Sequence, residues 1–142
     1  MNTGPAGPNE PSGAPEAASP TKWWGGLRRI GRAFDHSVRG LRAAWTHEAA
    51  FRQELLAGGL LVLLVPWVAA TAWQAVALVG AVVLVLIVEL LNSAIESLAD
   101  AVSLEHHPLL GRAKDLGSAA VFLSLLLAGA VWLVAIVDRF LS

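Results

Sequence analysis

The sequence has no cysteine and few charged residues. Without cysteine, a chain of 142 residues can form neither a disulfide framework nor a metal site with thiolate ligands. Charged residues make up 15% of the chain and hydrophobic residues 56%. The formal net charge of −1 carries little information, and we expect no nucleic-acid partner. The sequence also lacks a P-loop, a protein-kinase signature and a glycine-rich phosphate cradle, so no nucleotide site follows from a local motif.

The first 21 residues differ in composition from the rest of the chain. They hold five of the seven prolines and no aromatic residue, and such a segment cannot bury enough apolar surface to offset its ordering entropy. A basic start and an apolar core are both missing, which is unlike a signal peptide. We therefore predict a disordered tail over residues 1–21 and a single membrane domain over residues 22–142.

Three uncharged runs dominate this domain. They cover Leu55–Ala72, Trp73–Val88 and Leu116–Val137. A helix needs roughly 20 residues to cross a hydrocarbon core of about 30 Å. We therefore predict an all-α membrane protein with three transmembrane helices, over about residues 50–70, 73–100 and 112–138. The alternative, a buried helical hairpin of a soluble protein, would leave the chain with almost no polar surface.

An amphipathic helix is predicted ahead of the spans, over about residues 27–46. Its apolar residues recur at helical spacing on one face, and its arginines fall on the other. The apolar residues are Leu27, Ile30, Phe34, Val38, Leu41 and Trp45. Such a helix suits the membrane interface, where it serves at least as an anchor. Seven of the ten lysines and arginines precede the first span, so the positive-inside rule predicts a cytoplasmic N-terminus and an external C-terminus.

Polar residues form one stripe along the helix expected for the stretch VELLNSAIESLAD (88–100). The stripe is about 100° wide and runs from the edge of the hydrocarbon into water. It consists of Glu89, Asn92, Ser93, Glu96 and Asp100. Carboxylates near hydrocarbon are costly, so they usually mark an ion path, a proton relay or a catalytic site.

Two further polar clusters are expected at the same membrane level. HEAAFRQE (47–54) precedes the first span, and HHPLLGRAKD (106–115) precedes the third. Carboxylates suit Mg²⁺, and lysine or arginine suits phosphate. The three clusters together are therefore suited to hold a metal–nucleotide complex that faces a lipid headgroup.

The same charges permit other interpretations. Ion pairs between helices, Glu89 with Arg52 or Glu96 with Lys114, would neutralise them without any ligand. A small channel or proton-coupled transporter also uses intramembrane carboxylates, although it would place polar residues along much of a span. A non-enzymatic assembly subunit would use the polar stripe only to fix helix packing, and it would consume no ATP.

Three stretches resemble the prokaryotic diacylglycerol kinase family: GLRAAWTHEAAFRQE (40–54), VELLNSAIESLAD (88–100) and GRAKDLGSAAV (111–121). The resemblance covers roughly residues 27–138. It implies a homotrimer in the bacterial inner membrane, with active sites shared between subunits at the cytoplasmic face. The implied reaction transfers the γ-phosphoryl group of MgATP to diacylglycerol and gives phosphatidic acid. A related undecaprenol kinase would keep the same stripe for a longer lipid, and it remains the alternative.

The resemblance also assigns roles to residues. It implies that Glu89 is the general base, that Asn92 orients the site, and that Glu48 and Glu96 hold Mg²⁺ with ATP. The nucleotide site that it implies comprises Arg29, His36, Glu48, Glu96, Glu105, His106, His107, Lys114 and Asp115. The lipid site that it implies comprises Arg29, Glu54, Glu89, Ser118 and Trp132. The chain departs from the family pattern at His36, where the family has a tyrosine, and at His106, which replaces an aromatic residue.

Overall fold

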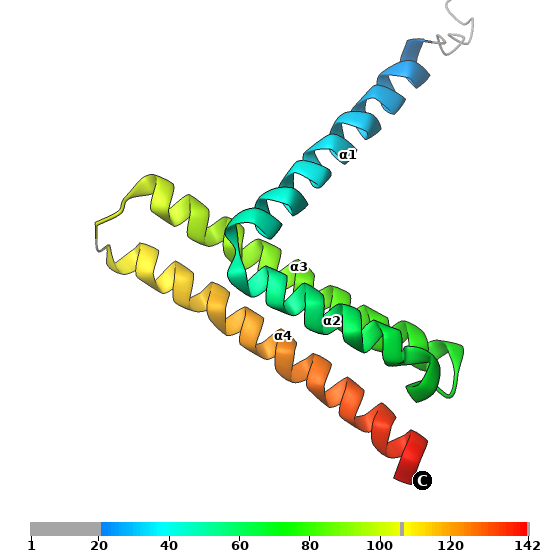
Figure 1. Ribbon diagram of the computed structural model, residues 1–142. Coiled ribbons are helices and arrows are strands. Elements are labelled where there is room, and N and C mark those ends of the chain that lie inside the picture. The colour runs from blue at the N-terminus through cyan, green and yellow to red at the C-terminus, as the bar shows by residue number, and fades with distance from the viewer. Residues whose placement is uncertain (1–20, 106, 142) are drawn as a thin grey trace, which may run out of the picture. The chain divides into compact units, whose positions relative to one another are not determined.

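The computed structural model describes residues 21–105 and 107–141. Over these ranges the chain forms four helices and no strand: α1 (Thr21–His47), α2 (Ala49–Val68), α3 (Ala72–Val102) and α4 (Pro108–Leu141) (Figure 1). Helices α2, α3 and α4 are each long and apolar enough to cross a membrane. The prediction of an all-α membrane protein with three transmembrane helices is therefore confirmed.

The helix that precedes the spans, α1, begins at Thr21, earlier than the start near residue 27 that the apolar periodicity indicated. Of the predicted tail over residues 1–21, all but Thr21 lies outside the described residues. The apolar side chains of α1, among them Ile30, Phe34 and Trp45, are exposed, as expected of a helix whose apolar face meets a membrane. The chain divides into two compact units at Ser37–Val38, and the three spans belong to the second unit.

A short turn at residues 69–71 joins α2 to α3. Thr71 caps α3, because its hydroxyl oxygen accepts a hydrogen bond from the backbone N–H of Gln74 at 3.2 Å. Gln74 also stabilises the turn, since its Oε1 accepts from the backbone N–H of Ala70, the residue before the cap, at 2.7 Å. Pro66 lies in the last turn of α2, near the helix end, where water can replace the backbone hydrogen bond that its ring removes. Local chemistry therefore stabilises a tight connection between two spans.

The C-terminal end of α4 is held against this turn by side-chain hydrogen bonds. Gln74 Nε2 donates to Asp138 Oδ2 at 2.8 Å, and Arg139 Nε donates to the backbone oxygen of Trp67 at 3.2 Å. A buried apolar cluster lies next to them and consists of Val65, Val68, Leu78, Val82, Trp132 and Ala135. These contacts fix how α4 is placed along α3, and so which α4 residues face the polar stripe.

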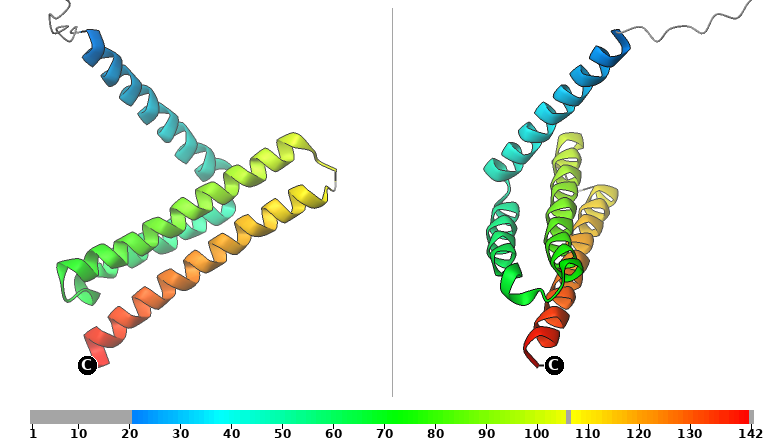
Figure 2. Two further views of the ribbon diagram at one scale, coloured as in Figure 1. Left: turned by 180° about the vertical axis from the view of Figure 1, so that it is seen from behind. Right: turned by 90° about the vertical axis from the view of Figure 1, so that its right-hand side faces the viewer.

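Helix α3 is the central helix of the three spans. It packs most extensively against α4 and less extensively against α2, whereas α2 and α4 touch only slightly (Figure 2). Gly58 permits the approach of α2, because a Cβ atom at this position would lie 2.5 Å from Val82 Cγ1. The polar stripe of α3 is thereby placed between its two neighbours.

We expect the substitution Gly58→Ala to destabilise the protein. The added methyl group overlaps the side chain of Val82, and overpacking of this kind costs about 1–3 kcal/mol. Gly59→Ala is the matched control, since a Cβ at Gly59 meets nothing within 4 Å and alanine favours the helix. Thermal unfolding followed by circular dichroism should show a lower midpoint for Gly58→Ala alone. Equal midpoints for the two variants would contradict this account of the α2–α3 contact.

Candidate active site at the loop end of α3

The polar stripe of α3 passes from the protein interior to its surface. Glu89 is only 3% exposed, and Asn92 and Ser93 are each 8% exposed. Glu96, about two turns beyond Glu89, is partly buried, and Asp100 is exposed. A buried carboxylate in a spanning helix is costly and needs compensating partners, so Glu89 is the most informative residue of the stripe.

Asn92 and Glu96 are joined within the stripe. Asn92 Nδ2 donates a hydrogen bond to Glu96 Oε1 at 3.0 Å, which is the usual contact between residues four apart on a helix. The other amide atom, Asn92 Oδ1, is buried and has no hydrogen-bond partner in the described part of the chain. The Nδ2 group of Asn92 therefore orients the Glu96 carboxylate, and its Oδ1 atom can still accept a hydrogen bond from a ligand.

The first turns of α2 bring two further carboxylates to the stripe. Glu48 occupies the N-cap position of α2, but its side chain makes no capping hydrogen bond. Glu54 is partly buried, and its Oε2 atom has no partner among the described residues. The charges of Glu48, Glu54 and Glu96 all act on Glu89. Three carboxylates, two from the start of α2 and one from α3, thus repel the carboxylate of Glu89, an arrangement that suits a bound cation.

The two ion pairs considered as alternatives for these charges are not formed. Arg52 Nη1 instead donates to the backbone oxygens of Trp45 and Thr46, at 3.0 and 3.3 Å, and so caps the end of α1. Lys114 Nζ pairs with Asp100 Oδ1 at 2.5 Å and not with Glu96. Arg52 therefore does not neutralise Glu89, and Lys114 does not neutralise Glu96.

A polar cavity of about 280 Å³ lies beyond the stripe, where α3 ends and α4 begins. It brings together Glu105, His107 and Lys114, three residues that were predicted to bind nucleotide. Asp115, on the same turn as Lys114, is exposed, and His106 lies outside the described residues. Asp100, the outermost residue of the polar stripe, also lines this cavity, so the cavity lies at the outer end of the stripe.

The predicted lipid residues are not all brought to this place. Ser118 lies on the exposed surface of α4. Trp132 is 5% exposed and donates from Nε1 to the backbone oxygen of Leu78 at 3.3 Å. Leu78 precedes Glu89 by about 16 Å along α3, so Trp132 packs in the core near the other end of the span. The structure shows that Trp132 packs in the buried apolar cluster. A contact of Trp132 with the lipid stays a prediction.

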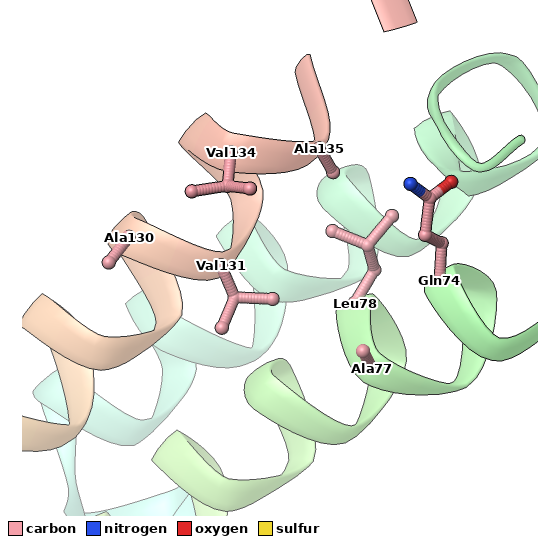
Figure 3. Close-up of a pocket in the computed structure, with 7 residues that line it drawn as sticks. All are labelled: Gln74, Ala77, Leu78, Ala130, Val131, Val134 and Ala135. Atoms are coloured by element: carbon pink, nitrogen blue, oxygen red, sulfur yellow. The ribbon is translucent and has the colours of Figure 1, made fainter. Parts of the chain in front are cut away.

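A second cavity lies near Trp132, between α3 and α4. Its volume is about 350 Å³, and its lining is almost entirely apolar (Figure 3). The lining residues are Gln74, Ala77, Leu78, Ala130, Val131, Val134 and Ala135. No charged group lines it, so this cavity is unsuited to a phosphate or a metal ion.

Two predicted nucleotide residues, Arg29 and His36, lie on α1 in the first unit of the chain, and both are exposed. The remaining candidates lie in the second unit. The contact of Arg29 and His36 with the nucleotide stays a prediction.

The donor groups around Glu89 fit a magnesium ion that is shared with a substrate. Within the described ranges, no three acidic or histidine side chains converge closely enough to hold a metal by themselves. Mg²⁺ is usually bound by only one or two carboxylates, with phosphate oxygens and water completing its shell. Glu48, which makes no capping bond, and Glu96, which accepts from Asn92, would be the two carboxylates of such a site.

Sequence reasoning missed two features of the site. The pairing of Lys114 with Asp100 was not predicted, because the sequence does not show which of several carboxylates lies nearest to Lys114 in space. Gly117 was also missed, although a Cβ atom there would overlap Asn92 Oδ1. A glycine within a helical pattern was the available signal, since it often marks a close approach of two helices.

Three spanning helices with carboxylates and a lysine gathered at one end define an integral membrane protein equipped for chemistry at the membrane surface. Residues 35–136 match the family model of the prokaryotic diacylglycerol kinases. The chain belongs to this family.

Curated relatives match over most of their length. The diacylglycerol kinase of Escherichia coli K12 is 47% identical over 115 residues, which cover 81% of this chain and 94% of the relative. The diacylglycerol kinase of Pseudomonas aeruginosa is 44% identical over 80% of this chain and 93% of its own length. That of Haemophilus influenzae is 39% identical, over 75% and 91% respectively.

Proposed function

We propose that this protein phosphorylates diacylglycerol with ATP and releases phosphatidic acid and ADP. The observation that carries the proposal is the buried carboxylate of Glu89 in a spanning helix, with further carboxylates near it. The polar stripe of α3 leads from Glu89 to the cavity that Lys114 helps to line. Membership of the family and the names of the relatives support the same activity. The lipid would approach from the bilayer, and the nucleotide would approach from water.

The reaction needs positioning more than covalent catalysis. The hydroxyl oxygen of diacylglycerol forms a bond to the γ-phosphorus of ATP, and the bond from this phosphorus to the β–γ bridging oxygen breaks. The proton of the hydroxyl passes to the Glu89 carboxylate, so Glu89 is the general base. Its deep position on the stripe suits a group that meets the lipid, whereas Glu96 lies nearer the cavity.

The nucleotide would be held at the outer part of the stripe. A bound Mg²⁺, with Glu48 and Glu96 as its protein ligands, would supply charge neutralisation at the phosphate oxygens. Asn92 holds the Glu96 carboxylate in place through the bond from Nδ2. Lys114 would leave its exposed pair with Asp100 and donate to phosphate, helped by Asp115.

Further nucleotide and lipid contacts complete the proposal. Glu105, His106 and His107 would meet the nucleotide near the start of α4, with Arg29 and His36 from α1. Arg29, Glu54, Ser118 and Trp132 would contribute to the lipid site.

We also propose a homotrimer with active sites shared between subunits. Large apolar side chains are exposed along all three spans, including Leu63, Leu91 and Leu126, and lipid or neighbouring subunits would cover them. The basic residues before the first span support a cytoplasmic N-terminus and an external C-terminus in the bacterial inner membrane.

A substrate panel tests the activity. The purified full chain in mixed micelles should consume ATP when Mg²⁺ and diacylglycerol are both present, and thin-layer chromatography should identify phosphatidic acid. Faster phosphorylation of undecaprenol than of diacylglycerol would assign the other lipid. Absence of lipid-dependent ATP consumption with either substrate would refute a kinase function.

We expect Lys114→Met to raise the KM for MgATP by about tenfold or more. A hydrogen bond to a charged group contributes about 1.5–3 kcal/mol, whereas the exposed ion pair with Asp100 contributes about 1 kcal/mol or less. Asp100→Asn is the matched control, because it breaks the same ion pair but leaves the cation in place. Steady-state kinetics with varied MgATP should show the rise for Lys114→Met only. Equal KM values for the two variants would mean that Lys114 serves the ion pair alone.

A further inference from the structure

Gly117 of α4 lies directly against the amide of Asn92. A Cβ atom at Gly117 would overlap Asn92 Oδ1 and would lie 3.4 Å from Cγ and 3.8 Å from Cα of the same residue. Both residues are buried. A residue with a Cβ atom at position 117 would collide with the amide of Asn92, and glycine has only a hydrogen atom there. Gly117 therefore leaves room for this amide.

The contact fixes which way the amide of Asn92 points. Glu96 Oε1 is an acceptor, so the amide must turn its Nδ2 donor toward Glu96, at 3.0 Å. The oxygen then lies on the opposite side of the amide, against Gly117. An added methyl group at position 117 would push this oxygen away, and the rotation would carry Nδ2 away from Glu96.

We infer that Gly117 is a positioning residue, which orients the Glu96 carboxylate through the amide of Asn92. The inference rests on the proposed function, in which Glu96 holds Mg²⁺ with the nucleotide. Within the described ranges, Asn92 is the side chain that hydrogen bonds to Glu96, so the carboxylate has no second anchor there. Groups that orient a metal ligand typically change metal affinity about 10–100-fold when they are removed.

Direct metal binding tests the inference. Mn²⁺ is added to the full-length protein in detergent micelles with a non-hydrolysable ATP analogue, and free Mn²⁺ is followed by its paramagnetic resonance signal. Gly117→Ala should raise the Kd for Mn²⁺ about tenfold. Gly129→Ala is the matched control on the same helix, because a Cβ at Gly129 meets nothing within 4 Å, and its Kd should equal that of the wild type.

A double-mutant cycle separates positioning from general packing. Asn92→Ala should raise the Kd as Gly117→Ala does, and it removes the side chain with which the methyl group collides. Gly117→Ala should therefore have no further effect in the Asn92→Ala background. An added rise in that background would overturn the inference, as would a wild-type Kd in Gly117→Ala or no Mn²⁺ binding by the wild-type protein.

Folding and the proposed function are controlled separately. If Gly117→Ala does not fold, the double variant decides, because its collision is relieved: a folded double variant with the Kd of Asn92→Ala supports the inference, and an unfolded one overturns it. Lipid-dependent ATP consumption by the wild type is measured in parallel. Its absence would remove the proposed function, while the Mn²⁺ titrations would still decide the role of Gly117.

Discussion

Replacing Glu89 with glutamine is expected to lower the kcat for diacylglycerol phosphorylation at least about a hundredfold. A general base contributes typically 10²–10⁴-fold to a rate, and glutamine cannot accept the proton of the lipid hydroxyl. The KM for MgATP should change little, because Glu89 lies deeper than the residues proposed to hold the nucleotide. Initial rates at saturating MgATP and diacylglycerol measure this effect.

The fold of the Glu89→Gln variant should be preserved. Glutamine has nearly the same shape as glutamate, and it removes a buried charge on which Glu48, Glu54 and Glu96 act unfavourably. Its thermal midpoint should therefore equal or exceed that of the wild type. A lost activity with a lowered midpoint would point to misfolding and would count against this account.

Asp138→Asn is the control for removal of a carboxylate. Asp138 lies at the other end of the spans, where its Oδ2 accepts from Gln74, and asparagine keeps an acceptor oxygen. This variant should retain the wild-type kcat. Wild-type turnover by Glu89→Gln would exclude Glu89 as the base, whatever its burial.

The helices and the stripe were predictable because both depend on local sequence. A long uncharged run in a membrane forms a helix, because its backbone N–H and C=O groups must hydrogen bond to one another. The 3.6-residue period then places Glu89, Asn92 and Glu96 on one face of that helix. The burial of Glu89 and the Asn92–Glu96 bond agree with that expectation.

The choice of partners was not predictable from the sequence. Arg52 caps the end of α1 and Lys114 pairs with Asp100, because the placement of the helices decides which of several similar charges is nearest. Trp132 packs against Leu78 for the same reason. Gly117 is significant only because α4 brings it against Asn92. That approach depends on how α4 is placed along α3, which contacts at the other end of the two helices help to fix.

Glu96→Gln is expected to raise the Mg²⁺ concentration needed for half-maximal activity by about a hundredfold. This is the upper end of the range seen when a group that supports a metal is removed, because Glu96 is proposed as a ligand itself. The geometry should be retained, since a glutamine Oε1 can still accept from Asn92 Nδ2. The variant thus removes charge and ligand strength without removing the hydrogen bond.

A general loss of negative charge from the stripe has to be separated from loss of a ligand. Asp100→Asn removes one charge from the same face of α3, one turn beyond Glu96, where Asp100 is already paired with Lys114. If the negative field alone attracts Mg²⁺, both variants should shift the Mg²⁺ titration equally, and more so at low ionic strength. If Glu96 binds the ion, only Glu96→Gln should shift it strongly, and added salt should leave the difference between the two variants in place. An unchanged Mg²⁺ titration in Glu96→Gln would remove this residue from the metal site, and Glu48 with Glu54 would then be the remaining carboxylates close to Glu89.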